Sequence, residues 1–144
     1  FKTYIKAVKA NAKVMAEVLS DGGLNMVAGG TESHMVLVDL RPIGVTGKDA
    51  EKALDRARLT CNKNSVPNDP ESPFVTSGIR LGSPAGTTRG FGTDEFRQIA
   101  VAILKVLHGL AENGAEGNTS VEQEVAGEIK SLCEKFPIYS YLSK

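Results

Sequence analysis

The chain has 144 residues, of which 41% are hydrophobic and 24% charged, a composition typical of one globular domain of ordinary size. Seventeen basic residues balance seventeen acidic ones, so no broad positive field argues for a nucleic-acid partner. No apolar run is long enough to span a membrane and we recognise no signal peptide, so we expect a cytoplasmic protein. Cys61 and Cys133 have no metal-binding or redox spacing, which predicts reduced thiols and no metal site.

The first 20 residues predict an amphipathic helix that ends at a pair of glycines. Its apolar residues recur at spacings of three and four, namely Ile5, Val8, Ala12, Met15 and Leu19. The chain opens with Phe1 instead of methionine, and no capping residue precedes the helical pattern. We therefore expect residues 1–144 to be a single domain cut from a longer protein.

Two strand-like runs follow at residues 24–28 and 34–40, separated by turn residues. The second run is apolar on both faces, which is typical of an interior strand. Residues 46–57 then predict a helix, with Thr46 as its cap and Asp49 three residues later, as in a capping box.

Short strands are predicted at residues 58–62 and 77–82, on either side of a proline-rich loop. Thr93 is the predicted cap of a long helix, and Ser120 with Gln123 predicts a capping box at the start of the last helix. Strands and helices do not alternate strictly along the chain. We therefore expect an α+β fold, with a small and mainly antiparallel sheet packed against helices.

One arginine stands out in the glycine-bracketed segment GIRLG, residues 78–82. Strand alternation places Ile79 and Leu81 on one face and Arg80 on the other, and the glycines allow a ligand or another backbone to approach. A guanidinium held in this way offers two parallel N–H donors that match a carboxylate. From the pattern alone, an arginine on the solvent side of an edge strand, or one paired with an internal aspartate, is the favoured interpretation.

The loop before this strand is stiff, because Pro67, Pro70 and Pro73 each fix φ and hold the preceding residue extended. Such a loop would present its backbone groups and Phe74 in fixed positions. Asn64, just before the loop, can donate and accept hydrogen bonds at once, which suits a heterocycle with mixed edges. An Asx turn into the loop is the more ordinary role for this asparagine.

The stretch NKNSVPNDPESPFVTSGIRLGSPAGTTRGF, residues 62–91, resembles serine hydroxymethyltransferases, pyridoxal-phosphate enzymes that interconvert serine and glycine with tetrahydrofolate. The segments GGTESHMVLVDLR and GVTGKDAEKALDRARLTCNKNSVPNDP are similar to the same family. The resemblance runs from the first helix to about Leu110 and then, more loosely, includes CEKFPIY near the end. It implies the C-terminal small domain of the bacterial-type enzyme, which has the fold-type-I architecture of the aspartate aminotransferases.

The resemblance also implies roles for five residues. Arg80 would hold the carboxylate of the amino-acid substrate. Asn64 would contact the pterin part of tetrahydrofolate, and Ser72, Pro73 and Phe74 would lie against the folate. No catalytic residue of the family falls within this chain.

The lysine that binds pyridoxal 5′-phosphate in the family has no counterpart here, since Lys63, the only lysine near the motif, lacks the threonine-rich context. His34 and His108 are expected to have structural roles. The helix at residues 1–20 would connect to a large domain that carries the cofactor, in a cytoplasmic and homodimeric parent enzyme of one-carbon metabolism. We expect this chain to be inactive alone. The alternative is a free-standing amino-acid-binding or regulatory module without catalysis.

Overall fold

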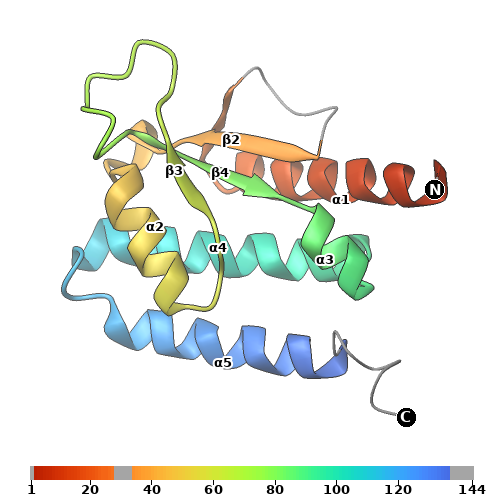
Figure 1. The fold of residues 1–144 in the computed structure, drawn as a ribbon. Coiled ribbons are helices and arrows are strands. Elements are labelled where there is room, and N and C mark those ends of the chain that lie inside the picture. Colours follow the sequence, from red (N-terminus) through yellow and green to blue (C-terminus); the bar gives the residue numbers. More distant parts are fainter. Residues whose placement is uncertain (1, 28–33, 137–144) are drawn as a thin grey trace.

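A computed structural model describes residues 2–27 and 34–136, which form a sheet layer backed by helices (Figure 1). The four strands are antiparallel and lie in the order β1-β2-β4-β3. The strands are β1 (Asn25–Met26), β2 (Met35–Asp39), β3 (Asn62–Asn64) and β4 (Gly78–Gly82). The helices are α1 (Lys2–Asp21), α2 (Gly47–Arg56), α3 (Pro84–Arg89), α4 (Thr93–Asn113) and α5 (Thr119–Lys135), with a 3-10 turn at Arg41–Ile43. The predicted α+β class with a small antiparallel sheet is confirmed.

The first helix forms where the apolar spacing predicts it. Its buried face begins at Val8 and continues through Leu19, whereas Ile5, the first member of the predicted stripe, is exposed. The helix ends because Gly23 adopts a left-handed φ of 96°, which lets the N–H of Leu24 reach the carbonyl of Leu19 at 3.1 Å.

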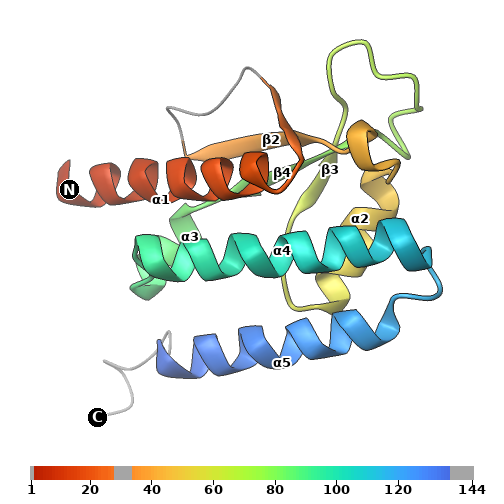
Figure 2. The ribbon, with the colours of Figure 1, turned by 180° about the vertical axis from the view of Figure 1, so that it is seen from behind.

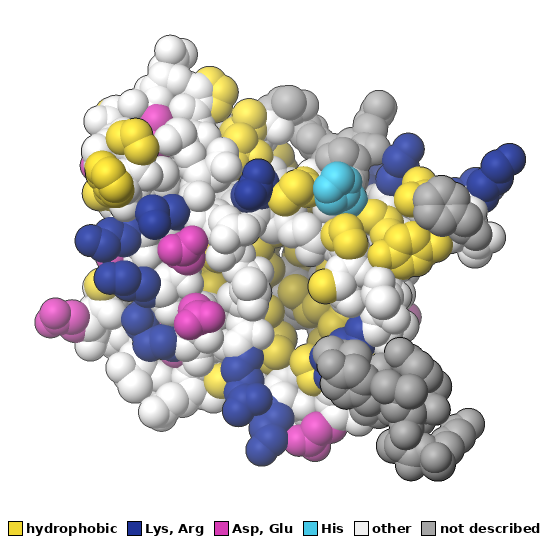
Figure 3. All heavy atoms as spheres, viewed as in Figure 1, with side chains coloured by type: hydrophobic (Ala, Val, Ile, Leu, Met, Phe, Trp, Pro, Cys, Tyr) yellow, Lys and Arg dark blue, Asp and Glu magenta, His cyan; other side chains and the backbone are white. Residues whose placement is uncertain are grey.

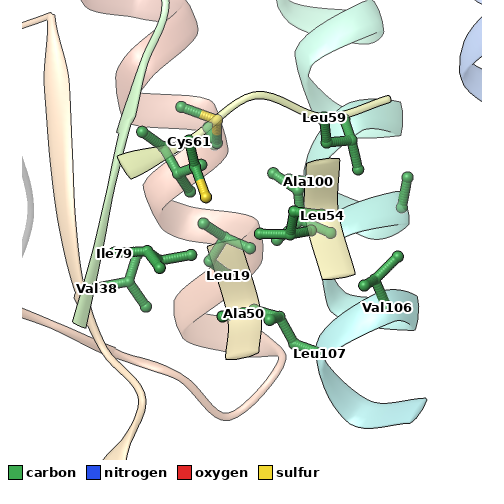
Figure 4. Close-up of a cluster of buried hydrophobic side chains, with 14 of the residues drawn as sticks. Leu19, Val38, Ala50, Leu54, Leu59, Cys61, Ile79, Ala100, Val106 and Leu107 are labelled. Carbon is green, nitrogen blue, oxygen red and sulfur yellow. The ribbon is translucent and has the colours of Figure 1, made fainter. Parts of the chain in front are cut away.

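The core lies between the inner face of the sheet and helices α1, α2 and α4. Figure 4 shows side chains from these elements pointing toward one another, including Leu19, Val38, Leu54, Ile79 and Leu107. All five are fully shielded from solvent. Because β2 lies between β1 and β4, the prediction of an interior strand at residues 34–40 is confirmed.

Helix α5 lies farthest from the sheet and packs against α4 and α2 (Figures 1 and 2). A charged pair joins α2 to α5, since Arg56 Nε donates to Glu122 Oε1 at 2.7 Å and its second nitrogen donates to Oε2 at 3.1 Å. Glu122 is buried, and a buried carboxylate needs a cationic partner. Arg56, which is distant in the sequence, supplies that partner.

The predicted strand at residues 58–62 is wrong by several residues, because β3 begins only at Asn62. Arg58 has a φ of 67° and the N–H of Leu59 bonds back to the carbonyl of Leu54 at 2.8 Å, so this part of the chain is still leaving α2. Leu59 and Cys61 are buried as the loop crosses the core. The alternation of buried and exposed residues at 58–62 therefore comes from a loop that packs on the core, and not from a strand.

One of the predicted helix caps is formed and a second is shifted by one residue. Thr46 caps α2 as predicted, with its Oγ1 accepting the N–H of Asp49 at 3.2 Å. Before α4, however, the cap is Gly92, whose N–H donates to Glu95 Oε1 at 2.7 Å, and Thr93 is already the first helical residue. The prediction for Thr93 is therefore wrong by one position.

The capping box of Ser120 with Gln123 is not formed, because both residues lie inside α5. The helix begins at Thr119, after Asn118, whose side-chain nitrogen donates to the carbonyl of Val106 in α4 at 3.1 Å. A contact between helices therefore decides where α5 starts.

Helix α3 has no counterpart in the sequence prediction. It is one short segment held by contacts with α1: Asn11 Nδ2 donates to Thr87 Oγ1 at 2.9 Å, and Ser83 Oγ donates to the carbonyl of Val8 at 2.7 Å. Among the residues that the structure describes, no helix is long and apolar enough to cross a membrane.

Candidate functional site

The outer face of the sheet, opposite the helices, carries two of the predicted site residues. Directly opposed residues of antiparallel strands share a face, and Arg80 of β4 lies opposite Leu37 of β2 and Asn62 of β3. In the next row Asn64 lies opposite Gly78. Arg80 and Asn64 therefore stand on one face, in adjacent rows of neighbouring strands.

Arg80 is exposed and its guanidinium forms no hydrogen bond or ion pair with any residue in ranges 2–27 and 34–136. Its strand is interior, between β2 and β3. Neither ordinary interpretation of this arginine therefore holds, since it is neither on an edge strand nor paired with an internal aspartate.

The buried acid on the same face of the sheet already has a cation of its own. Asp39 accepts two hydrogen bonds from Arg41 Nε, both at 3.0 Å, and one from Arg41 Nη2 at 2.6 Å. These side-chain bonds are the main reason that the pKa of Asp39 lies below its usual value. The charge of Asp39 is thus satisfied locally, and Arg80 is left available for an anion from outside the described residues.

Asn64 is half-buried at the end of β3. Its Nδ2 donates to the carbonyl of Ser65 at 2.9 Å, which is a local contact but not the Asx turn expected from the sequence. Its Oδ1 has no partner in the part of the chain that the structure describes. The amide oxygen is therefore open to a donor on a ligand.

The loop between β3 and β4 projects from the body of the domain (Figures 1 and 2). Ser72, Pro73 and Phe74 are all exposed on it, and Phe74 is 82% exposed. An aromatic ring left so far in solvent offers a flat apolar surface to a ligand or to another part of a protein. No hydrogen bond joins these three residues to Arg80 or Asn64 in the described ranges. The five predicted residues therefore form two groups, one on the outer face of the sheet and one on the loop.

The start of α2 holds one end of this loop. Its first N–H groups, which have no partner within the helix, donate to the loop: Gly47 to the carbonyl of Thr76 and Lys48 to that of Val75, both at 2.9 Å. A side chain at Gly47 would collide with Thr76 and Gly78, so glycine is required there. Thr76 has a φ of 60°, a strained conformation for a β-branched residue directly before the strand of Arg80.

The sequence reasoning missed the residue that organises the loop internally. Asp69 accepts four hydrogen bonds, from the N–H groups of Val66, Glu71 and Ser77 and from the hydroxyl of Ser77. The signal that could have indicated it is an aspartate between two prolines in a turn-rich segment.

The remaining candidate groups, two histidines and two cysteines, differ in their contacts. His108 Nε2 lies 2.9 Å from the carbonyl of Gly22 and so joins α4 to the end of α1. His34 is exposed and its side chain makes no hydrogen bond among the described residues, so the structural role predicted for it has no support there. Both cysteines are free, and burial, aided by nearby acids, raises the pKa of Cys61 to about 12. Within the described ranges, no three His, Cys, Asp or Glu residues gather in a way that could hold a metal ion.

A separate apolar pocket lies on the helix side of the sheet, and Figure 3 shows it as a hollow lined by hydrophobic side chains. Its volume is about 250 Å³, and its walls come from α1, β4, α3, α4 and α5 and include Met15, Leu81, Arg89, Phe96, Ile103 and Ile129. None of the five predicted site residues lines it.

Comparison with known proteins identifies the family. Residues 1–103 match the family model described as serine hydroxymethyltransferase. Curated serine hydroxymethyltransferases from Paracoccus denitrificans and Ruegeria pomeroyi are each 61% identical over 142 residues, covering 99% of this chain and 33% of each relative. The enzyme of Rhizorhabdus wittichii is 61% identical over 99% of this chain and 32% of its own length. The chain belongs to the serine hydroxymethyltransferase family and spans about a third of the length of these relatives.

Proposed function

We propose that this chain is the C-terminal small domain of an enzyme that interconverts serine and glycine with tetrahydrofolate as the one-carbon carrier. The observation that carries the proposal is the exposed guanidinium of Arg80, which has no partner in the described ranges although its strand is interior. The planar fork of donors on this group matches the two oxygens of a carboxylate.

In this proposal Arg80 orients the amino acid. Two parallel N–H···O bonds to the substrate carboxylate fix both its position and its rotation, which a single contact would not do. The orientation of the carboxylate in turn fixes which bond at Cα faces the reacting groups of the whole enzyme. Gly82, two residues after Arg80, is exposed and leaves room for the ligand, whereas the space over Gly78 is filled by Val66.

The folate would occupy the same face and the projecting loop. The free Oδ1 of Asn64 can accept a hydrogen bond from a pterin, and it lies in the row next to Arg80. The exposed ring of Phe74, which follows Ser72 and Pro73, offers a flat apolar surface for an aromatic ring. Two substrates would thus meet at one open face of the sheet.

The residues described here do not fit the attachment of pyridoxal 5′-phosphate. A lysine that forms a Schiff base is usually desolvated or held beside another cation. Every lysine in the described ranges is exposed except Lys63, which is half-buried and lies 3.8 Å from the carboxylate of Glu51. We propose that the rest of the parent enzyme, a cytoplasmic homodimer as the resemblance implies, holds this cofactor, and that the isolated chain is inactive.

The experiment uses the full-length enzyme that contains this chain. Asn64→Ala and Phe74→Ala should weaken tetrahydrofolate-dependent turnover of serine far more than the folate-independent cleavage of a 3-hydroxy amino acid, because both residues lie on the folate side. Val101→Ala, at an exposed apolar residue of α4, is the control and should change neither reaction. Equal losses in the two reactions would contradict the assignment of these residues to folate.

A further inference from the structure

The loop of residues 65–77 is organised around a single carboxylate. Oδ2 of Asp69 accepts the N–H of Val66 at 3.1 Å and the N–H of Ser77 at 2.8 Å. Oδ1 accepts the N–H of Glu71 at 2.9 Å and the hydroxyl of Ser77 at 2.7 Å. Both oxygens are therefore used as double acceptors, and this arrangement requires a group with no donor of its own.

The four bonds tie the two ends of the loop to each other and to the sheet. Val66 follows Ser65 at the loop's start, and its side chain packs so closely on Gly78 that a Cβ there would lie 2.6 Å from Val66 Cγ1. Ser77, at the other end, accepts the N–H of Leu40 through its carbonyl at 2.8 Å, which fixes it beside the end of β2. Asp69 thus holds the proline segment in one position relative to the outer face of the sheet.

The two anchors of the loop act on different parts of it. The start of α2 binds Val75 and Thr76, close to β4. The carboxylate of Asp69 instead contacts Val66 and Glu71, on the segment that leads to Ser72. The carbonyl of Ser72 accepts the N–H groups of Val75 at 3.0 Å and Thr76 at 2.9 Å, so the turn that carries Phe74 has the α2 anchor on one side and Asp69 on the other. The approach to that turn therefore depends on the carboxylate, whereas the strand of Arg80 is held by five ladder pairs with β2 and three with β3.

We propose that Asp69 is a positioning residue for the folate subsite: without touching the ligand, it sets the place of Phe74 relative to Asn64. The inference rests on the function proposed above. A loop already fixed in its binding conformation loses less entropy when the ligand arrives, and so binds more tightly. Arg80 should stay in place without Asp69, because the strand pairs hold it.

The test is Asp69→Asn in the full-length enzyme. Asparagine keeps the size of the side chain but turns an N–H₂ group toward two of the donors. The KM for tetrahydrofolate should rise by about tenfold or more, since a displacement of roughly 1 Å can cost about a hundredfold. The kcat/KM for folate-independent cleavage of a 3-hydroxy amino acid should change by less than about threefold, and this split separates positioning from a general loss of structure.

Glu71→Gln is the matched control. It removes the same charge from the same loop, but the side chain of Glu71 is exposed and only its backbone N–H contacts Asp69. It should change neither reaction. Ser77→Ala removes one of the four bonds and keeps the charge, so the KM for tetrahydrofolate should rise by a smaller factor, roughly two- to threefold. That variant decides the matter if Asp69→Asn does not fold.

The inference is overturned if a folded Asp69→Asn enzyme, or Ser77→Ala in its place, keeps the normal KM for tetrahydrofolate, or if both reactions fall equally. Phe74→Ala measured alongside separates the two hypotheses. If Phe74→Ala weakens folate use and Asp69→Asn does not, only the positioning role fails. If Phe74→Ala has no effect, the folate subsite itself is misplaced, and the role of Asp69 is refuted with it.

Discussion

Replacing Arg80 by lysine in the full-length enzyme should severely impair serine turnover although the positive charge is kept. The guanidinium is a rigid planar fork with parallel donors, whereas the ammonium of lysine is a compact, strongly hydrated charge on a flexible stem. Only the fork fixes a carboxylate in two directions. The substitution therefore separates the need for a charge from the need for a defined geometry.

The size of the effect follows from the surroundings of Arg80. Its side chain is exposed and contacts no polar group in the described ranges, so the change should alter the free energy of unfolding by no more than about 0.5 kcal/mol. Losing one charge-assisted hydrogen bond to the substrate costs roughly 1.5–3 kcal/mol, or about one to two decades in serine affinity. Misalignment of the Cα bond by about 1 Å should lower kcat by up to roughly another hundredfold.

The assay measures serine affinity, kcat and the absorbance of the bound cofactor on the wild type and on two variants. The control is Arg97→Lys, the same chemical change at an exposed arginine of α4 whose 3.3 Å pair with Asp94 lies one helical turn away. That control should be indistinguishable from the wild type. The cofactor absorbance should persist in both variants, because the proposed cofactor site lies outside this chain.

The reasoning is refuted if the Arg80→Lys enzyme binds and turns over serine like the wild type. Arg80 would then be an exposed surface residue whose lack of an internal partner has no functional meaning. A loss of cofactor absorbance would also refute it, since the substitution would then be acting on a different part of the enzyme from the carboxylate.

Two further predictions concern the chain itself. Burial raises the pKa of Asp69, but the hydrogen bonds from Glu71, Ser77 and Val66 outweigh it and lower the pKa from 3.8 to about 2. The carboxylate therefore stabilises the fold above about pH 4, and this contribution is lost as the pH falls toward about 2. The difference in thermal unfolding midpoint between the wild type and Asp69→Asn should become smaller from about pH 6 to about pH 3. A difference that stays constant over this range would contradict the role of the Asp69 carboxylate in stabilising the loop. The isolated chain should exchange no serine for glycine, and a stoichiometric, borohydride-reducible cofactor band on it would show this to be wrong.

The elements that the sequence predicts well are those stabilised within a few residues. Three such features are the apolar period of α1, the side-chain cap of Thr46 and the alternation around Arg80. Each involves residues that are neighbours along the chain, so the sequence pattern alone predicts it. The errors lie where a distant group intervenes. Asn118 is drawn to the carbonyl of Val106 and α5 starts beside it, and α3 is held by side chains of α1.

The sequence by itself determined the fold class, the place of the proline loop between two strands and, through its resemblance to a known family, the five residues proposed to meet the substrates. Only the tertiary structure decided that Arg80 stands on an interior strand with no partner in the described ranges, and that Asn64 shares its face. It also revealed that Asp69 joins the two ends of the loop. The physical reason is that a charged side chain is free to bind a ligand only if no group of the fold lies close enough to pair with it. Which groups lie close is set by the pairing of strands that are far apart in the sequence.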